Sequence, residues 1–451
     1  MIPVLTPEEM AAVDRAAPES VEVLIERAGA AVARAALDLL GGAYGRRVVV
    51  VAGKGNNGND GRAAAVRLRR RGVRVRIMEA AEAEGTRLPP ADLVIDAAYG
   101  TGFRGEYHAP VAPTGAAVLA VDIPSGVDGL TGAANGDAVV ADVTVTFAAL
   151  KPGLLFGEGR ARAGVVDVAD IGLDADTAAH NHVVEPDDVG RWFPARPADV
   201  HKWDTALRIV AGSGGMVGAA HLCARAAMRA GAGMIHLGAP GVTKPNPPLE
   251  VVGTPLPATG WDDVVLDDLA RFGALAIGPG LGRDEAVGAA AVRLIAGAPV
   301  PVVVDADGLF ALGDGASLEG RRGRITVLTP HEGEFARLAG DKPGPDRLGA
   351  VRALALRTGA TVLLKGAVTV VADPGGDALI CATGDDRLAT AGTGDVLTGI
   401  VGAFLALGLD GFRAAAAAAT VHGLAGHLGW RRGLVAGDLL DHVPAVLSEL
   451  A

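Results

Sequence analysis

The stretch "VVVVAGKGNNGNDGRAAAVRL", residues 48–68, decides the fold of the first half of the chain. An apolar, β-branched run leads into a glycine-rich turn, and the turn leads into a helical pattern. Gly53, Gly55 and Gly58 form a G-x-G-x-x-G spacing, which is typical of dinucleotide-binding turns but weak on its own. Glu79 closes the next strand-like run, "VRVRIME", where that fingerprint places a carboxylate for a ribose.

Composition limits the classes of protein to which the chain can belong. With 451 residues, 50% of them hydrophobic and 21% charged, we expect two folded domains with large cores. The net charge of -11 argues against affinity for nucleic acid or an anionic membrane. Cys223 and Cys381 form no paired motif, and the first residues lack a secretory pattern, so we expect a cytoplasmic protein without disulfides or a zinc site.

The first half alternates strand-like and helical runs after two helical segments, "TPEEMAAVDRAA" and "VEVLIERAGAAVARAALDLL". This rhythm predicts a mostly parallel, doubly wound sheet with helices on both faces. The predicted strands are Val48–Ala52, Val73–Met78, Leu93–Ala97, Ala117–Val121, Val143–Phe147 and Val165–Val168.

A second alternation of strands and helices follows a break in the pattern. Residues 172–203 are polar, contain proline and have no sustained period, which indicates a linker or the start of a second unit. From residue 207 onward, short β-branched runs again precede glycine-rich turns and, usually, helices, which predicts a second α/β domain with a long parallel sheet. The apolar run at 396–409 lies between Asp395 and Asp410 and is too short for a bilayer, so we expect a buried helix there.

Polar side chains follow three of the predicted strands in the first half. In an open parallel sheet, ligands bind beyond the carboxyl ends of the strands, so these side chains are expected to meet. Their oxygen atoms suit an alkali or alkaline-earth cation, although any one of them taken alone could simply stabilise a turn. The set consists of Asn56, Asn57 and Asp60 after the first strand, Asp96 after the third, and Asp122 with Ser125 after the fourth.

Together these motifs resemble the YjeF N-terminal domain, the NAD(P)H-hydrate epimerase, over residues 1–172. The matching stretches are "TPEEM", "LIERAG", "GKGNNGNDG", "DAAYGTGFRGE" and "DIPSGVDG". The resemblance implies a Rossmann-like domain in which Asp122 is the acid/base residue and Asn57, Asp96 and Ser125 hold a potassium ion. It also implies that the hydrated cofactor binds to Asn56, Asn57, Gly58, Asn59, Asp60, Gly100, Thr101, Gly102, Phe103, Arg104, Gly105, Glu106 and Asp122.

Asn59 departs from the family pattern, because the loop usually reads NNGGDG. If this position required a positive φ, Asn would be the least costly replacement for glycine.

The segment "ATAGTGDVLTGIVGAFL" is the main candidate site of the second half. Gly392, Thr393 and Gly394 precede Asp395 at the start of an apolar helix, where free amides and the helix dipole favour an anion. A carboxylate at this place can take a proton from a substrate hydroxyl. An ordinary helix cap made by Thr393 or Asp395 explains the fragment equally well.

The wider context resembles the ribokinase-like superfamily and, within it, the YjeF C-terminal domain, the ADP-dependent NAD(P)H-hydrate dehydratase, over residues 183–451. The more selective stretches are "AGSGGMVGAA", "TPHEGE" and "KGAVT". The resemblance implies a linker at 173–182, Asp395 as the catalytic base, and an anion hole at Gly392, Thr393 and Gly394. It further implies that Ala219, Gly280, His331 and Asp395 contact the hydrated cofactor, and that Lys365, Gly366, Ala367, Val368, Thr369 and Gly394 bind ADP.

The joint resemblance implies a bifunctional repair enzyme, a lyase and isomerase that acts on NADHX and NADPHX. Potassium and Mg²⁺ would be its cofactors and ADP its co-substrate; we expect no nucleic-acid or membrane partner, and a homo-oligomer is compatible with these features. Two other hypotheses remain open: a ribokinase-like kinase of vitamin precursors with an N-terminal nucleotide-binding module, and a non-catalytic partner protein.

Overall fold

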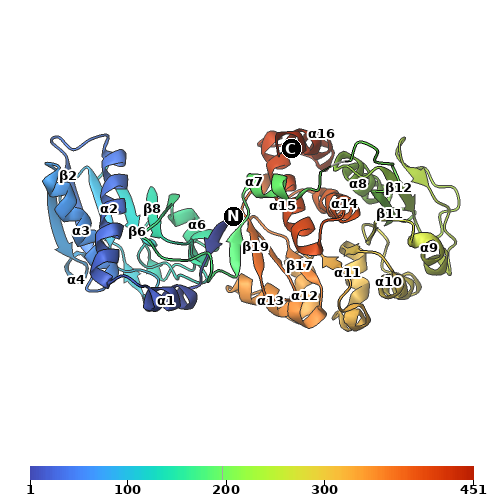
Figure 1. The fold of residues 1–451 in the computed structure, drawn as a ribbon, viewed down its shortest axis with the longest axis horizontal. Helices are drawn as coiled ribbons and strands as arrows, with labels where there is room; N and C mark the ends of the chain where they lie inside the picture. Colours follow the sequence, from blue (N-terminus) through green and yellow to red (C-terminus); the bar gives the residue numbers. More distant parts are fainter. Residues whose placement is uncertain (196, 451) are drawn as a thin grey trace. The chain divides into compact units, whose positions relative to one another are not determined.

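The computed structural model describes residues 1–195 and 197–450, which form two compact units (Figure 1). The first unit covers Ile2–Asn181, and the second contains Met1 and the chain from His182 onward. The division falls at the end of segment 173–182, which the sequence suggested as a linker. No described helix is long and apolar enough to cross a membrane.

The first unit is built on a six-stranded parallel sheet. All six predicted strands are confirmed, with ends that shift by one residue at most. The sheet order is β3 (Arg74–Glu79), β2 (Arg47–Ala52), β4 (Leu93–Ala97), β6 (Ala117–Val121), β8 (Val143–Phe147) and β9 (Val165–Ala169). The chain steps from β2 outward to β3 and then back to β4, so the strand order reverses beside β2. Such a reversal opens a crevice at the carboxyl ends of the strands.

Helices and short segments cover the two faces of this sheet. Residues at alternate positions of β2 face opposite sides: Val48 and Val50 pack with α2 and α3, whereas Val49 and Val51 pack under α4. The remaining elements are short or lie outside the sheet. The elements are α1 (Pro7–Ala16), α2 (Val21–Leu40), α3 (Asn56–Arg70), α4 (Ala80–Ala83), α5 (Pro152–Leu155) and α6 (Gly159–Arg162), with β1 (Ile2–Val4), β5 (Tyr107–His108) and β7 (Gly136–Asp137).

The second unit contains a longer sheet that is parallel over its centre. Its strand order is β10 (Asn181–Val183), β19 (Ala378–Cys381), β18 (Thr369–Ala372), β17 (Thr361–Leu364), β16 (Thr326–Leu328), β15 (Val302–Val304), β14 (Ala274–Ile277), β11 (Ala206–Val210), β12 (Met234–Gly238) and β13 (Val252–Gly253). The pairings from β17 through β13 are parallel. The two-domain α/β fold predicted from the sequence is therefore confirmed.

One detail of the prediction was wrong. The sheet is not parallel throughout, because β17, β18 and β19 are antiparallel neighbours. Residues 365–368 alone connect β17 to β18, and a connection this short can join only antiparallel strands. The segment 172–203, which the sequence predicted to be a linker or the start of a second unit, contains β10 and the short helix α7 (Pro186–Trp192).

Helices cover the second sheet and complete its core. They are α8 (Val217–Arg229), α9 (Trp261–Leu269), α10 (Glu285–Gly297), α11 (Ala306–Leu312), α12 (Glu332–Ala339), α13 (Arg347–Thr358), α14 (Thr393–Ala406), α15 (Gly411–Leu428) and α16 (Ala436–Leu450), with the 3₁₀ turns η1 (Ala316–Arg321) and η2 (Asp386–Leu388). The predicted buried helix is α14, whose residues 396–406 are all buried.

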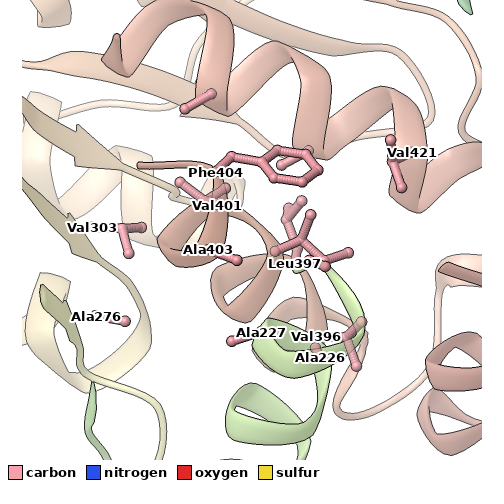
Figure 2. Packing of buried hydrophobic residues seen from close by; sticks show 14 of the residues in the cluster. Ala226, Ala227, Ala276, Val303, Val396, Leu397, Val401, Ala403, Phe404 and Val421 are labelled. Atoms are coloured by element: carbon pink, nitrogen blue, oxygen red, sulfur yellow. The ribbon is translucent and has the colours of Figure 1, made fainter. Parts of the chain in front are cut away.

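Figure 2 shows α14 between the sheet residues Ala276 and Val303 on one side and helices α8 and α15 on the other. A helix that is apolar all round is stable only when it is enclosed in this way. Gly399 permits the close contact with α8, because a Cβ atom there would lie 2.2 Å from the backbone oxygen of Cys223. The core thereby fixes the position of the first turn of α14, which carries Asp395.

Candidate active sites

A cavity of about 1020 Å³ opens at the carboxyl edge of the first sheet, where the strand order reverses. Its walls come from the loop after β2, the loop after β4, the end of β6 and helices α1 and α2. Of the predicted binding residues, those that line the cavity are Asn56, Asn57, Asp60, Gly100, Thr101, Gly102, Phe103, Arg104 and Asp122.

The other four predicted binding residues, Gly58, Asn59, Gly105 and Glu106, are not part of the cavity wall. Gly58 has a packing role instead, because a Cβ atom there would lie 1.9 Å from the oxygen of Gly53. Asn59 lies inside α3 and is not among the described non-glycine residues with positive φ. The idea that this position needs a left-handed backbone is therefore wrong, and Asn meets an ordinary helical backbone there.

Asp122 is the central carboxylate of this cavity. It follows β6 with φ of 69°, a strained backbone for a non-glycine residue, which tends to be stored at functional sites. Its Oδ1 atom lies 2.8 Å from Nζ of Lys151, and the Thr146 hydroxyl donates to the same oxygen at 3.3 Å. The carboxylate is 16% exposed, whereas Lys151 is 1% exposed. The buried lysine therefore fixes the position of the carboxylate, and the more exposed Asp122 side chain faces the cavity.

Lys151 was not predicted from the sequence, although a signal was present. It comes four residues after β8, so the rule that singled out residues beyond the other strand ends applies to it as well. Besides Asp122, it donates to the Thr146 hydroxyl at 2.7 Å and to the Phe147 carbonyl at 3.1 Å. Three acceptors satisfy the buried ammonium group, which would otherwise be costly to desolvate.

Two further aspartates line the same cavity, Asp60 from α3 and Asp14 from α1. Burial raises the pKa of Asp60 to about 8, and the negative charges of Asp122 and Asp14 add to the shift. Burial also raises the pKa of Asp14. At neutral pH the Asp60 carboxyl thus keeps its proton, and the cavity contains both a proton donor and a carboxylate acceptor.

Of the three predicted cation ligands, Asn57 lines this cavity, whereas Asp96 and Ser125 are buried and do not line it. The Ser125 hydroxyl donates to Oδ1 of Asp96 at 2.7 Å, and its amide donates to Oδ2 at 2.8 Å. Asn57 is unusual, because both of its side-chain polar atoms are buried without a hydrogen-bond partner among the described residues. A buried amide in this state costs free energy unless a ligand satisfies it.

In the second unit, the predicted anion site lies at the first turn of α14. Gly392 is the N-cap with φ of 91°, and no side chain caps the helix. The Thr393 hydroxyl donates to the carbonyls of Leu388 at 2.8 Å and Thr390 at 2.9 Å, away from the first-turn amides. The alternative of an ordinary side-chain cap does not hold here. The Thr393 amide lies 3.5 Å from the Thr390 carbonyl, and no side chain caps the amides that follow it, which is the arrangement that binds phosphates.

Asp395 lies in this first turn with an altered acidity. Burial raises its pKa to about 6; the charges of Asp305 and Asp307 add to the shift, and the Lys365 charge opposes it. Near neutral pH the carboxylate is therefore mostly ionised but more basic than an exposed aspartate. This suits a general base, which works best when its pKa lies close to the working pH.

Asp305 forms the centre of the second site and was not predicted as a functional residue. It lies at the end of β15 and accepts from Lys365 Nζ at 2.8 Å and from the Thr398 hydroxyl at 2.6 Å. A Cβ atom on Gly394 would lie 3.6 Å from Lys365 Nζ and 3.8 Å from Asp305 Oδ2. The buried Asp305 thus links Lys365, in the loop after β17, to Thr398 of α14.

The remaining predicted residues of the second unit lie on several elements: Ala219 is in α8, Gly280 follows β14, and His331 precedes α12. Gly280, with φ of 66°, leaves room for the side chains of Met216 and Ala219. His331 is the N-cap of α12, where its Nδ1 atom accepts from the amides of Gly333 at 2.9 Å and Glu334 at 3.3 Å. Gly366, Ala367 and Val368 form the turn between β17 and β18, which Lys365 and Thr369 flank.

Within the described part of the chain, no group of three His, Cys, Asp or Glu side chains has a metal-binding arrangement. The predicted potassium ligands Asn57, Asp96 and Ser125 include only one side chain of these four types.

Comparisons with known sequences match both units. The family model described as NAD(P)H-hydrate dehydratase matches residues 207–445. The model described as YjeF-related protein N-terminus matches residues 21–88 and 77–153. Each candidate site thus lies in a part of the chain that matches one of these two families.

Full-length relatives and a solved structure extend these matches. The bifunctional NAD(P)H-hydrate repair enzyme of Moorella thermoacetica is 38% identical over 99% of this chain and 97% of its own length. Its Mycobacterium tuberculosis counterpart is 44% identical over 83% of this chain and 82% of its own. The ADP/ATP-dependent NAD(P)H-hydrate dehydratase from Bacillus subtilis, co-crystallised with ATP and Mg²⁺, is 31% identical with a TM-score of 0.52, covering 59% of this chain and 98% of that protein.

Proposed function

The chain belongs to the family of bifunctional NAD(P)H-hydrate repair enzymes, and we propose that its two units catalyse two successive steps. The first unit interconverts the R and S epimers of NADHX and NADPHX. The second unit dehydrates the S epimer to NADH or NADPH and converts ADP to AMP and phosphate. The observation that carries this proposal is the first turn of α14, where Asp395 lies beside uncapped amides and the Asp305–Lys365 pair.

In the dehydration, Asp395 removes the proton from the hydroxyl group at carbon 6 of the nicotinamide ring. The oxygen then attacks the β-phosphorus of ADP, the bond to the α-phosphate oxygen breaks, and AMP leaves. The carbon–oxygen bond of the new phosphate ester breaks next, because phosphate is a far better leaving group than hydroxide. Loss of a proton from carbon 5 restores the dihydropyridine.

The residues around Asp395 bind the charged groups of this reaction. The amides of Gly392, Thr393 and Gly394 face the transferring phosphoryl group, and the Lys365 ammonium lies beside them. Mg²⁺ bound with ADP would offset part of the phosphate charge. The Gly366–Thr369 turn supplies backbone groups for the nucleotide, and Gly280, Ala219 and His331 form the wall for the hydrated cofactor.

In the epimerisation, Asp122 takes the proton of the same hydroxyl group. Carbon 6 carries both this hydroxyl and the ring nitrogen, so the carbon–nitrogen bond can open to an aldehyde while the nitrogen takes up a proton. Asp60, protonated at neutral pH, is placed in the same cavity to supply that proton. Rotation and ring closure then give the other epimer, and both protons return.

The residues after β2, β4 and β6 also fit a potassium ion. Asn57 and Ser125 offer neutral oxygens and Asp96 a carboxylate, and the unpartnered amide of Asn57 is the observation that supports a ligand there. A bound cation would supply a fixed positive charge next to the ring-opening site. Its ligands lie on the same loops that form the wall of the cavity.

A cytoplasmic location fits the same proposal. Both cysteines are free and buried, as expected in a reducing compartment, and the reduced cofactors that become hydrated are used there.

The test is the recovery of reduced-nicotinamide absorbance from a mixture of both NADHX epimers, with Mg²⁺, potassium and ADP. Full ADP-dependent recovery together with AMP is the expected result, because the dehydratase alone stalls when the S epimer runs out. A phosphorylated product without restored NADH would instead identify the second unit as a small-molecule kinase.

A further inference from the structure

An arginine–glutamate pair lies at one end of the cavity in the first unit. Glu79 ends β3 and lines the cavity together with Ala80, Ala81 and Glu82. Arg62 reaches it from α3, and its Nη2 atom donates to both carboxylate oxygens of Glu79 at 2.8 Å. The Nη1 atom of the same guanidinium donates to the Gly53 carbonyl at 2.6 Å. The pair is therefore tied to the glycine-rich turn itself.

The opposite end of the cavity holds the candidate reaction centre. Asp122 and Lys151 follow β6 and β8, whereas Glu79 follows β3. In the order β3-β2-β4-β6, three steps separate Glu79 from Asp122, which at ~4.8 Å a step is about 14 Å. The N-terminus of α3, a helix of 15 residues, lies between them. A dinucleotide with its hydrated ring at Asp122 thus has its pyrophosphate at this helix and its other half at Glu79.

We propose that Glu79 binds the ribose of the adenosine half, and that the Arg62–Glu79 pair makes the first unit prefer NADHX over NADPHX. This inference rests on the epimerase function proposed above. The Glu79 carboxylate accepts hydrogen bonds from ribose hydroxyls and repels the dianionic phosphate that NADPHX carries on the same sugar. Arg62, a cation beside this carboxylate, is already neutralised by its two bonds to Glu79.

The experiment measures epimerisation without ADP, by chromatographic separation of the epimers, for NADHX and NADPHX in turn. The full chain should show a higher kcat/KM for NADHX. Glu79→Gln removes the charge with little change in shape, so KM for NADHX should rise and KM for NADPHX should fall. The preference should change by about tenfold, the factor expected for one hydrogen bond to a charged group. Because Glu79 is remote from Asp122, kcat should stay the same for both substrates.

Glu26→Gln is the matched control. Glu26 pairs with Arg67 of the same helix α3 at the same distance of 2.8 Å, but neither residue lines the main cavity. This variant should leave both KM values unchanged. A second measurement needs no variant: AMP should inhibit epimerisation by the unaltered chain more strongly than adenosine 2′,5′-bisphosphate.

Three outcomes separate the inference from its premise. An unchanged preference in Glu79→Gln, with both substrates still turned over, would overturn the role of Glu79. Stronger inhibition by the bisphosphate would overturn it independently. Failure of the unaltered chain to epimerise either substrate would instead contradict the epimerase function proposed for the first unit.

Discussion

Each unit places a buried lysine–aspartate pair at the carboxyl edge of its sheet, with the same distance of 2.8 Å but the opposite exposure. In the first unit, Lys151 is 1% exposed and Asp122 16%. In the second unit, Asp305 is 2% exposed and Lys365 21%. The first pair therefore presents a carboxylate to its ligand, and the second presents an ammonium group.

This reversal matches the two chemistries that we propose. Epimerisation transfers protons as a carbon–nitrogen bond opens and closes, and an accessible carboxylate can accept one of these protons. Transfer of a phosphoryl group needs a positive charge next to the phosphate, and it leaves the proton to a second carboxylate, Asp395. A single kind of ion pair thus serves either purpose, according to which partner the fold buries.

The largest expected effect comes from replacing each of the two proton acceptors in turn by asparagine. Asp395→Asn should lower ADP-dependent dehydration by at least about 10³-fold, because the base is lost, and leave epimerisation intact. Asp122→Asn should do the reverse, so that only the S epimer present at the start is dehydrated. Absorbance recovery and epimer chromatography measure the two steps, and each variant is the control of the other. Loss of both activities in either variant would contradict two independent sites.

Asp305→Asn tests the buried member of the second pair. Without this charge Lys365 loses its anchor, so KM for ADP should rise and dehydration should fall by about 10²-fold, as for a broken buried ion pair. The like charge of Asp305 raises the pKa of Asp395, so its removal should lower that pKa from about 6. Since Asp395 must be ionised, the acidic limb of the pH–rate profile should move to lower pH.

Asp284→Asn is the control for this experiment, because Asp284 is also an aspartate at a helix start but caps α10 with its side chain. A fall in rate without a shift of the pH profile would show that Asp305 only stabilises the fold.

Much of this arrangement was accessible from the sequence. The predicted residues Asn57 and Asp122 line one cavity, and Asp96 bonds to Ser125, because β2, β4 and β6 are neighbours in a parallel sheet. That property follows from the rhythm of the chain. The antiparallel β17–β18 hairpin could have been predicted too, since four residues cannot form a parallel crossover.

The ion pairs were harder to predict, because no local pattern marks them. Lys365 and Asp305 lie 60 positions apart, and only the completed sheet brings their strand ends together. The exposure that distinguishes the two pairs depends on how α14, α1 and α2 cover each edge. Periodicity predicts that these helices exist, but it does not determine which partner of a pair they bury.

Potassium removal should affect the first unit alone. Replacing potassium by sodium should lower the epimerisation rate by about tenfold, because the smaller ion fits the same oxygen ligands less well, and leave dehydration of the pure S epimer unchanged. Ser125→Ala removes one of the three expected ligands and should weaken the dependence on potassium. Equal sensitivity of both steps would place the cation effect elsewhere.

The smallest expected effect concerns stability and distinguishes Asp60 from Asp122. The pKa of Asp60 rises from 3.8 to about 8 on folding, chiefly through burial, so the folded first unit keeps a proton that the unfolded chain releases above pH 3.8. Folding then takes up a proton, and stability falls as pH rises from about 4 to about 8. An asparagine at position 60 has nearly the shape of the protonated acid, and its side chain does not titrate in this pH range.

Asp60→Asn should therefore leave the unfolding temperature of the first unit unchanged at pH 3.5 and raise it progressively up to pH 8, by an amount on the order of a few kcal/mol in free energy. Calorimetry across that pH range measures the shift, with the transition of the second unit as an internal reference. A gain that does not depend on pH would indicate better packing rather than relief of a buried charge. The same variant should slow epimerisation if Asp60 supplies the proton to the ring nitrogen, so stability and rate would move in opposite directions.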